Sequence, residues 1–454
     1  MVVDNSFYAL EMWALVEYSV RGWPEAQGIR RCLSDVERCS IGAQAPERIG
    51  FQLSYGEVFD NLEERLRELS EDGGTILGYV YPHSPLELLI AHGITPSLVS
   101  TRPNAQGGFE ASLQTFSCSL TRNLFSQRSS GGLSFLSGIL FPSNTCDSLH
   151  NVSDVWRRRF SEDMIFRLTY PAGKLGDDSI QFLAEELRIL SQSLKEAYGR
   201  PLSMDTLSAA VGLVNGFREA AQTLYSCRIV DPSVVPYFEV ARMARDFLSL
   251  PSADAVDRIS SSANAASEIL EKNGQLTLAK SLRRELLDAT LRGNGIEVES
   301  DVPRILVAGG MVEPTVVACL FKGSDKIGGQ VVVLDLLSFG FKTAFTPLVD
   351  LAGDPFVAIS RSILGAPSEP TQEGLPERLE FLKRVLSRLS IDGVVVCEQS
   401  FCDPDQFEAP PLLRAASEVN VASLRLPIDP EVSDRSRLEG RIESFIETLQ
   451  GGAR

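Results

Sequence analysis

The sequence has little histidine and tryptophan, with three residues of each among 454, and it has fewer basic than acidic side chains. The 60 Asp and Glu residues outnumber the 43 Lys and Arg residues and give a formal charge of −17. Binding to a nucleic-acid backbone requires clustered Lys and Arg, so we expect no nucleic-acid partner. A small basic pocket for a phosphorylated cofactor is still compatible with this composition.

Long hydrophobic runs are also absent. No run approaches the roughly 20 apolar residues of a membrane span, so we expect no membrane partner. Residues 1–13 carry Asp4 and Glu11 and no Lys or Arg, which is unlike a signal peptide. These features predict a cytoplasmic protein.

None of the eight cysteines lies in a CxxC pair, which argues against a zinc ribbon or a thioredoxin-type motif. A disulfide framework is not expected in a large cytoplasmic chain. The cysteines are therefore free thiols, metal ligands or small buried residues. No GxxxxGK[ST] phosphate-binding loop is present.

Short apolar runs alternate with helical stretches in two parts of the chain. The first part has runs at 75–81, 96–100, 135–142 and 164–171, and the second has runs at 304–310, 330–336, 392–397 and 421–427. This alternation is typical of parallel α/β sheets. Between the two parts, residues 177–295 show only helical spacing of apolar residues. No internal repeat is evident from the motifs.

The predicted fold is therefore α/β, with two Rossmann-like or flavodoxin-like parallel-sheet domains, a helical N-terminal segment and a helical middle region. The expected boundaries are 1–72 for the N-terminal segment, 73–176 for the first α/β domain, 177–300 for the helical region and 301–454 for the second α/β domain.

Three cysteines follow apolar runs or precede helices, in polar, loop-like surroundings: Cys118 in TFSCSLTRN, Cys146 in SNTCD and Cys402 in EQSFCDPDQFE. In open parallel sheets, ligands bind beyond the carboxyl ends of the strands. A lone cysteine is more often a core residue, and packing is the interpretation for the other five: Cys32, Cys39, Cys227, Cys319 and Cys397.

A helix start favours a thiolate, which suits metal ligation. Three thiolates with three histidines in the whole chain do not make a four-thiolate zinc site. Soft thiolates suit iron–sulfur clusters, and three ligands on a cubane would leave one iron open.

The chain resembles the 2-hydroxyacyl-CoA dehydratase and benzoyl-CoA reductase family over about residues 70–170 and 300–450. YVYPHSPLELLIAHGITP is similar to the family's Pro–Glu–Ala–Gly–Pro motif. TFSCSLTRN, FPSNTCDSLHN and DGVVVCEQSFCDPDQFEAPPL resemble its three cluster-cysteine segments, and SRLEGRIESFIETL resembles its closing helix. Residues 1–50 and the central helical region match no motif of the family.

The resemblance implies a [4Fe-4S] cluster held by Cys118, Cys146 and Cys402, with Cys397 a second choice for the last position. It implies an oxygen-sensitive iron–sulfur lyase or oxidoreductase subunit that reduces a CoA thioester by one electron at an open-site cluster. The implied partners are a related second subunit, or a second copy, and an ATP-hydrolysing iron–sulfur activator protein. The alternatives are a double-cubane-cluster reductase of small molecules and a non-catalytic companion subunit.

His83 and Glu87 follow the first apolar run and are candidate catalytic acid–base residues. The alternative for His83 is a solvated turn, and for Glu87 a helix-start residue favoured by the dipole. His150 follows Cys146 by one helical turn and is a candidate hydrogen-bond donor to a cluster sulfur, although surface exposure explains it as well. The arginines at 157–159 could meet CoA phosphates, but they also fit a solvated helix face.

Overall fold

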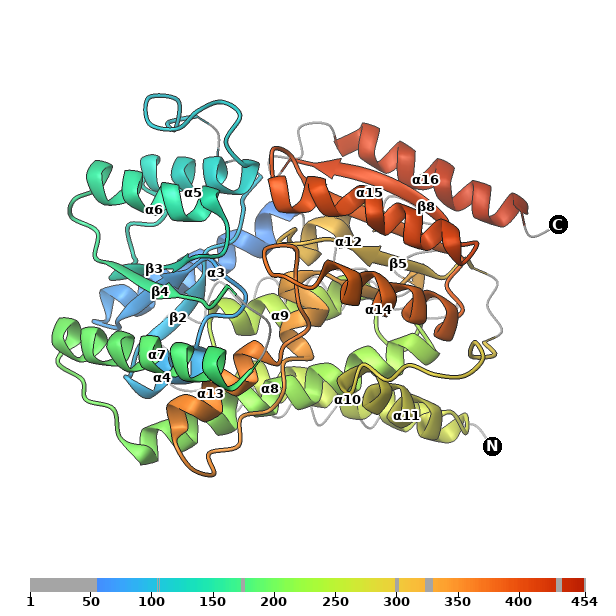
Figure 1. The fold of residues 1–454 in the computed structure, drawn as a ribbon, viewed down its shortest axis with the longest axis horizontal. Coiled ribbons are helices and arrows are strands. Elements are labelled where there is room, and N and C mark those ends of the chain that lie inside the picture. The colour runs from blue at the N-terminus through green and yellow to red at the C-terminus, as the bar shows by residue number, and fades with distance from the viewer. Residues whose placement is uncertain are drawn as a thin grey trace, which may run out of the picture. The chain divides into compact units, whose positions relative to one another are not determined.

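The computed structural model describes residues 55–452, except for 104, 106, 173–175, 299–301, 323–329 and 430–434 (Figure 1). The chain divides into two units, residues 1–52 and 53–454. The predicted helical character of residues 1–50 and the assignment of Cys32 and Cys39 to packing lie outside the described residues. Helix α3 (Tyr55–Glu71) is the first described element and agrees with the predicted helix over 57–71.

The first sheet is parallel and has the strand order β2-β1-β3-β4. Its strands fall on the four predicted apolar runs: β1 (Ile76–Tyr79), β2 (Thr95–Leu98), β3 (Gly138–Ser143) and β4 (Ile165–Thr169). All four residues of β1 are buried, which explains why the strand reads as a continuous apolar run without polar alternation.

Three helices connect the strands of the first sheet: α4 (Leu86–Ala91), α5 (Ser119–Ser129) and α6 (Asp147–Arg159). Helix α6 packs through Trp156, whose ring meets Phe125, Phe141 and Phe160 edge-on at centroid distances of 5.3 to 6.0 Å. The arginines at 157–159 are exposed in the last turn, where their charge complements the helix dipole. The three arginines form a solvated helix face, which is one of the two interpretations that the sequence left open.

The middle region is helical, as predicted, and its described residues contain no strand. Its helices are α7 (Asp177–Tyr198), α8 (Met204–Val230), α9 (Tyr237–Ser249), α10 (Ala253–Lys272) and α11 (Leu276–Leu287). Helix α8 packs against α4, α10 and α11 and also contacts β6 of the second sheet. Its Asn215 side chain exchanges two hydrogen bonds with the backbone of Val349, at 2.9 and 3.0 Å, and so ties this helix to the second α/β part.

The second sheet is parallel and has the order β6-β5-β7-β8. Its strands are β5 (Ile305–Ala308), β6 (Val332–Leu336), β7 (Gly393–Gln399) and β8 (Ala422–Ile428). Both sheets therefore have the flavodoxin-like order, with a topological switch point between their first and third strands. The sequence motifs did not reveal this structural repeat.

The helices of the second part are α12 (Pro314–Lys322), α13 (Pro355–Leu364), α14 (Leu375–Arg388), α15 (Asp403–Glu418) and α16 (Arg435–Gly452). A π-helical turn, η3 (Ser338–Lys342), follows β6. Buried Asp335 fixes this turn because it accepts hydrogen bonds from the backbone N–H groups of Leu337 and Phe341, at 3.1 and 3.0 Å. Tyr225 of α8 donates a third at 2.7 Å.

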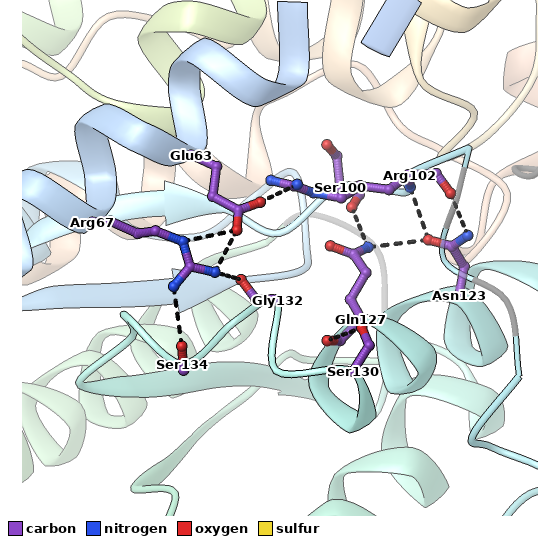
Figure 2. A network of polar contacts seen from close by, with 9 residues as sticks. All are labelled: Glu63, Arg67, Ser100, Arg102, Asn123, Gln127, Ser130, Gly132 and Ser134. Carbon is purple, nitrogen blue, oxygen red and sulfur yellow. Dashed lines mark hydrogen bonds and ion pairs between the residues drawn. The ribbon is translucent and has the colours of Figure 1, made fainter. Parts of the chain in front are cut away.

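A polar network holds α3, the loop after β2 and helix α5 together (Figure 2). Arg67 donates to Glu63 at 3.0 Å, and Glu63 also pairs with Arg102. Buried Asn123 accepts from Arg102 N–H at 2.8 Å and donates to its carbonyl at 2.7 Å. Gln127, one turn along α5, donates to the carbonyl of Ser100 at 2.8 Å. The network therefore positions the helix that begins immediately after Cys118.

Among the described residues, no helix combines the length and the apolar character that a bilayer crossing needs.

Candidate functional site

The three candidate cysteines occupy the N-cap positions of three helices. Cys118 precedes α5, Cys146 precedes α6 and Cys402 precedes α15. Cys146 lies three residues after the end of β3, and Cys402 lies three residues after the end of β7. Because β3 and β7 have the same place in the two sheets, these cysteines occupy equivalent positions in the structural repeat.

Direct hydrogen bonds join the turns that carry Cys118 and Cys402. The Ser119 N–H donates to the carbonyl of Ser400 at 2.9 Å, and the Ser119 hydroxyl donates to Gln399 Oε1 at 3.3 Å. Phe401, between Ser400 and Cys402, has a φ of 59°, a left-handed conformation that is strained for this residue type. The first sheet and the second sheet thus contribute adjacent thiols.

The thiols interact electrostatically. A hydrogen bond with Cys402 lowers the pKa of the Cys118 thiol, and the same bond, together with burial, raises the pKa of Cys402. Burial raises the pKa of Cys146 to about 12, and the charge of Cys118 adds to that increase. The backbone N–H of Leu149 points to the Cys146 sulfur at 3.5 Å and lowers its pKa in part. The helix start therefore favours a thiolate, but desolvation outweighs it at Cys146.

The donor set fits an iron–sulfur cluster better than a single metal ion. No group of three or more His, Cys, Asp or Glu side chains within the described ranges is arranged to hold one ion. A cubane is larger than one ion, so its thiolate ligands need not converge on a single point. Three thiols at three helix starts match the soft, anionic ligands that such clusters use. Burial of these thiols also favours a charge-compensating metal centre, which binds with release of protons.

A cleft of about 720 Å³ lies beside Cys146 and is lined from both α/β parts of the chain. Residues 145–148 at the start of α6 form one wall, and the 370–376 loop with the first two turns of α15 forms the other. Phe407 lines this cleft, although 80% of its surface is exposed. The volume of the cleft lies in the range of small-molecule and cofactor sites.

His83 is buried, not solvated, at the carboxyl end of β1. Its Nε2 is buried and has no hydrogen-bond partner. Its backbone carbonyl accepts from the Tyr170 hydroxyl at 3.0 Å. Burial lowers the pKa of His83, with smaller contributions from Lys342 and Arg218, so its imidazole is neutral at neutral pH. His83 also lines a small space with Arg218.

Glu87 is buried in α4 and pairs with Arg218 of α8 at 2.7 Å. Its side chain is 1% exposed and that of Arg218 is 7% exposed. Neither carboxylate oxygen of Glu87 receives a hydrogen bond of ordinary geometry. The structure therefore places Glu87 in a buried ion pair one side chain away from His83, and not among the three cysteines.

Three further charged residues, Glu369, Lys342 and Asp405, lie near the carboxyl ends of the strands. None of them was identified as a candidate from the sequence. Buried Glu369 accepts hydrogen bonds from Ser338 at 2.6 Å and from Thr371 at 2.8 Å. The protonated form of His83, the charge of Lys342 and the Ser338 hydrogen bond hold the pKa of Glu369 below its ordinary value against burial. Lys342 lies buried at the end of η3, and burial lowers its pKa.

Asp405 is the third of these residues and lies in the first turn of α15. It accepts the Gln399 N–H at 3.0 Å, and burial raises the pKa of its carboxyl to about 7. Lys342 directly follows the largely apolar stretch 330–341. This isolated basic residue is the one sequence signal that could have identified the three charged residues. Glu369 and Asp405 lie in polar loops or helix starts, where a carboxylate is common.

The other predicted positions have packing or surface contacts. Cys397 lies within β7 in an apolar cluster, so it does not share the edge with Cys402. Cys227 is buried in α8, and Cys319 is partly buried in α12. His150 is half-buried, and its Nδ1 lies 3.1 Å from the Ser143 hydroxyl, not on a cysteine sulfur.

Comparison with known proteins gives a consistent result. The profile of the family described as 2-hydroxyglutaryl-CoA dehydratase, D-component, matches residues 82–449. The chain is 24% identical over 388 residues to the beta subunit of lactoyl-CoA dehydratase from Anaerotignum propionicum, with 84% of this chain and 93% of that protein covered. It is 24% identical over 358 residues to a benzoyl-CoA reductase subunit of Thauera aromatica, with 76% and 83% covered. A putative dehydratase subunit of Escherichia coli is 21% identical over 409 residues, with 86% and 98% covered.

The family match spans more than four fifths of the chain and includes all three N-cap cysteines. The chain belongs to the 2-hydroxyglutaryl-CoA dehydratase D-component family, within the 2-hydroxyacyl-CoA dehydratase and benzoyl-CoA reductase group.

Proposed function

We propose that this chain is the cluster-bearing subunit of a cytoplasmic enzyme that dehydrates a 2-hydroxyacyl-CoA or reduces an acyl-CoA. Cys118, Cys146 and Cys402 hold a [4Fe-4S] cluster. The supporting observation is that these thiols lie at three helix starts from two sheets, with the turns of Cys118 and Cys402 joined by the Ser119 to Ser400 hydrogen bond. When bound, the cluster supplies one electron to the CoA thioester.

The cleft beside Cys146 receives the thioester in this proposal. Both α/β parts of the chain line it, and its volume of about 720 Å³ suits part of a CoA conjugate. The first turn of α15 and the start of α6 border the cleft with backbone N–H groups, and the carboxylates of Asp147 and Asp403 lie beside them, so these helix starts suit a neutral carbonyl oxygen better than an anionic group.

His83 is the proposed acid–base residue. Its neutral imidazole accepts a proton, and its buried Nε2 has no competing hydrogen-bond partner. Glu369 connects His83 to the cleft, because the Glu369 carboxylate stabilises the imidazolium that forms when His83 takes up a proton and because Glu369 accepts from Thr371, which lines the cleft. Glu87 acts as a positioning residue, since it neutralises and orients the Arg218 guanidinium that faces His83.

The proposed partner proteins rest on the names of the relatives and on exposed aromatic side chains. The relatives named above are subunits, and Phe116, Phe401 and Phe407 are exposed beside the helix starts that carry Cys118 and Cys402. We propose that these aromatic side chains are covered by a related second subunit, and that an ATP-hydrolysing iron–sulfur activator protein delivers the electron.

Anaerobic purification tests the proposal. We expect a brown protein with about four irons per chain and an iron–sulfur EPR signal on reduction. Cys118→Ala, Cys146→Ala and Cys402→Ala should each lose iron, while Cys227→Ala, a matched control in α8, should retain it. An iron-free protein under these conditions contradicts the proposal. A symmetric dimer formed by the isolated chain, with its two cubanes joined, would favour the double-cubane alternative, because the iron content per chain is the same in both cases.

A different measurement tests the alternative that this chain is a non-catalytic companion subunit. A cluster-bearing chain that shows no substrate-dependent spectral change alone, but restores activity to a second subunit, would be a companion and not the site of reduction.

A further inference from the structure

A second cavity, of about 290 Å³, lies at the carboxyl end of the second sheet and has no part in the mechanism proposed above. The ends of β5 and β6 border it, which is where open parallel sheets bind ligands. Its walls are mostly apolar and come largely from η3, α11 and α14: Leu286, Leu336, Phe341, Phe345, Phe381 and Leu382. Such a lining suits an apolar group and not a sugar or a phosphate.

The Arg378–Glu408 ion pair borders both this cavity and the cleft beside Cys146. Arg378 donates two hydrogen bonds to the Glu408 carboxylate, at 3.0 and 2.8 Å, and both side chains are largely buried. The same two residues line both spaces. The cavity and the cleft therefore meet at the ion pair.

The charged side chains that line the cavity are mixed in sign: Lys342, Arg378 and Arg384 with Glu377 and Glu408. Lys342 donates to the carbonyl of Gly309 at 3.3 Å, and the carboxylates of Glu369, Glu408 and Asp405 act on its charge. Arg378 is paired with Glu408, and Arg384 is exposed. A carboxylate inside the cavity would be desolvated among the apolar side chains, whereas an uncharged apolar group would not incur that cost.

We propose that this cavity binds the acyl group of the CoA thioester, and that this acyl group is apolar and uncharged. The inference rests on the proposed function and deepens it by assigning the substrate class. With about 290 Å³, the cavity has room for an acyl chain longer than an acetyl group. The thioester then lies on the Cys146 side of the Arg378–Glu408 ion pair, and the acyl chain passes beside the ion pair into the cavity.

The test is calorimetric titration of the anaerobically purified full-length chain with three CoA thioesters. Hexanoyl-CoA should bind about tenfold or more tightly than acetyl-CoA, because its chain fills the apolar cavity. Adipoyl-CoA has the same chain length but ends in a carboxylate, and it should bind no more tightly than acetyl-CoA.

Two variants change the cavity in opposite directions. Ala366→Phe fills it and should abolish the preference for hexanoyl-CoA while acetyl-CoA affinity is retained, which also shows that the variant is folded. Phe381→Ala enlarges the cavity and should move the preference toward decanoyl-CoA by about tenfold. Phe182→Ala, on an exposed face of α7, is the matched control and should change none of these affinities.

Equal affinity for hexanoyl-CoA and acetyl-CoA, or an unchanged preference in Ala366→Phe, overturns the inference and leaves the proposed function standing. Tighter binding of adipoyl-CoA overturns the apolar assignment. Failure of every thioester to bind overturns the proposed function, and the inference with it.

Discussion

Loss of the Glu87 carboxylate should destabilise the chain because it leaves the Arg218 guanidinium buried without its ionic partner. The two side chains are 1% and 7% exposed, and their ion-pair atoms lie 2.7 Å apart. Removing one partner of a buried pair costs about 3–5 kcal/mol. Arg218 keeps only long contacts, to the Pro347 carbonyl at 3.5 Å and the Ser362 hydroxyl at 3.4 Å. Because these remaining contacts are weak, the expected loss stays within that range, at least about 3 kcal/mol or roughly 150-fold in the unfolding equilibrium.

The assay is urea unfolding of Glu87→Leu, Arg218→Met and the double variant. Fluorescence of Trp156, which is buried against the first sheet, reports one side of the pair, and far-UV circular dichroism reports the helices. The double variant should recover most of the lost free energy of unfolding, because two apolar side chains replace two buried charges. Glu185→Gln, at an exposed ion pair on α7, is the control and should leave the midpoint unchanged.

A double variant as unstable as Glu87→Leu alone would refute this reasoning, because no interaction energy would then join the two residues. A Glu87→Leu chain that unfolds like the parent but loses activity would also refute it, and would make Glu87 a catalytic residue instead of a positioning one.

Three further predictions follow from individual contacts. Asn123→Ala should lower the free energy of unfolding by about 1–3 kcal/mol in urea titrations, because the Arg102 backbone N–H and carbonyl each lose a hydrogen bond to this side chain; an unchanged unfolding midpoint would contradict this. Gly310→Ala would place a Cβ against the Asp405 carboxylate and should cost about 1–3 kcal/mol, whereas Gly212→Ala, in open space on α8, should not. The pKa of His83, read by NMR of histidine-labelled protein, should lie below 6.5; since the unfolded chain then binds more protons, stability should fall as pH drops below about 6.5, and His83→Gln should reduce that slope.

The positions of the sheet strands and of most helices could be read from the sequence. The eight strands coincide with the eight apolar runs to within about three residues at each end. Six of them are almost wholly buried and need continuous apolar side chains, while the edge strands β4 and β8 are partly exposed. Helices α13 and α15 and the π-helical turn η3 were not predicted. Small and aromatic residues alternate without a clear helical period around η3, and α15 contains Pro410 and Pro411, which disfavour a helix.

The residues of the candidate site also divide into those that local sequence identifies and those that it does not. Cys146 and Cys402 closely follow apolar runs, and Cys118 directly precedes a helix, so local sequence identified all three as candidates without the structure. Local sequence contains no information on which distant carboxylate meets which base. The Glu87–Arg218 pair joins residues 131 positions apart in sequence, and its existence depends on how α4 packs against α8.

The sequence by itself determined the order of strands and helices, the family resemblance and the three thiols that precede helices. Only the tertiary structure decided that both sheets share one strand order, that Cys118 and Cys402 are adjacent, and that Glu369, Lys342 and Asp405 gather beside His83. The physical reason is that periodicity and helix capping are local, whereas burial, desolvation and charge pairing depend on which elements pack together.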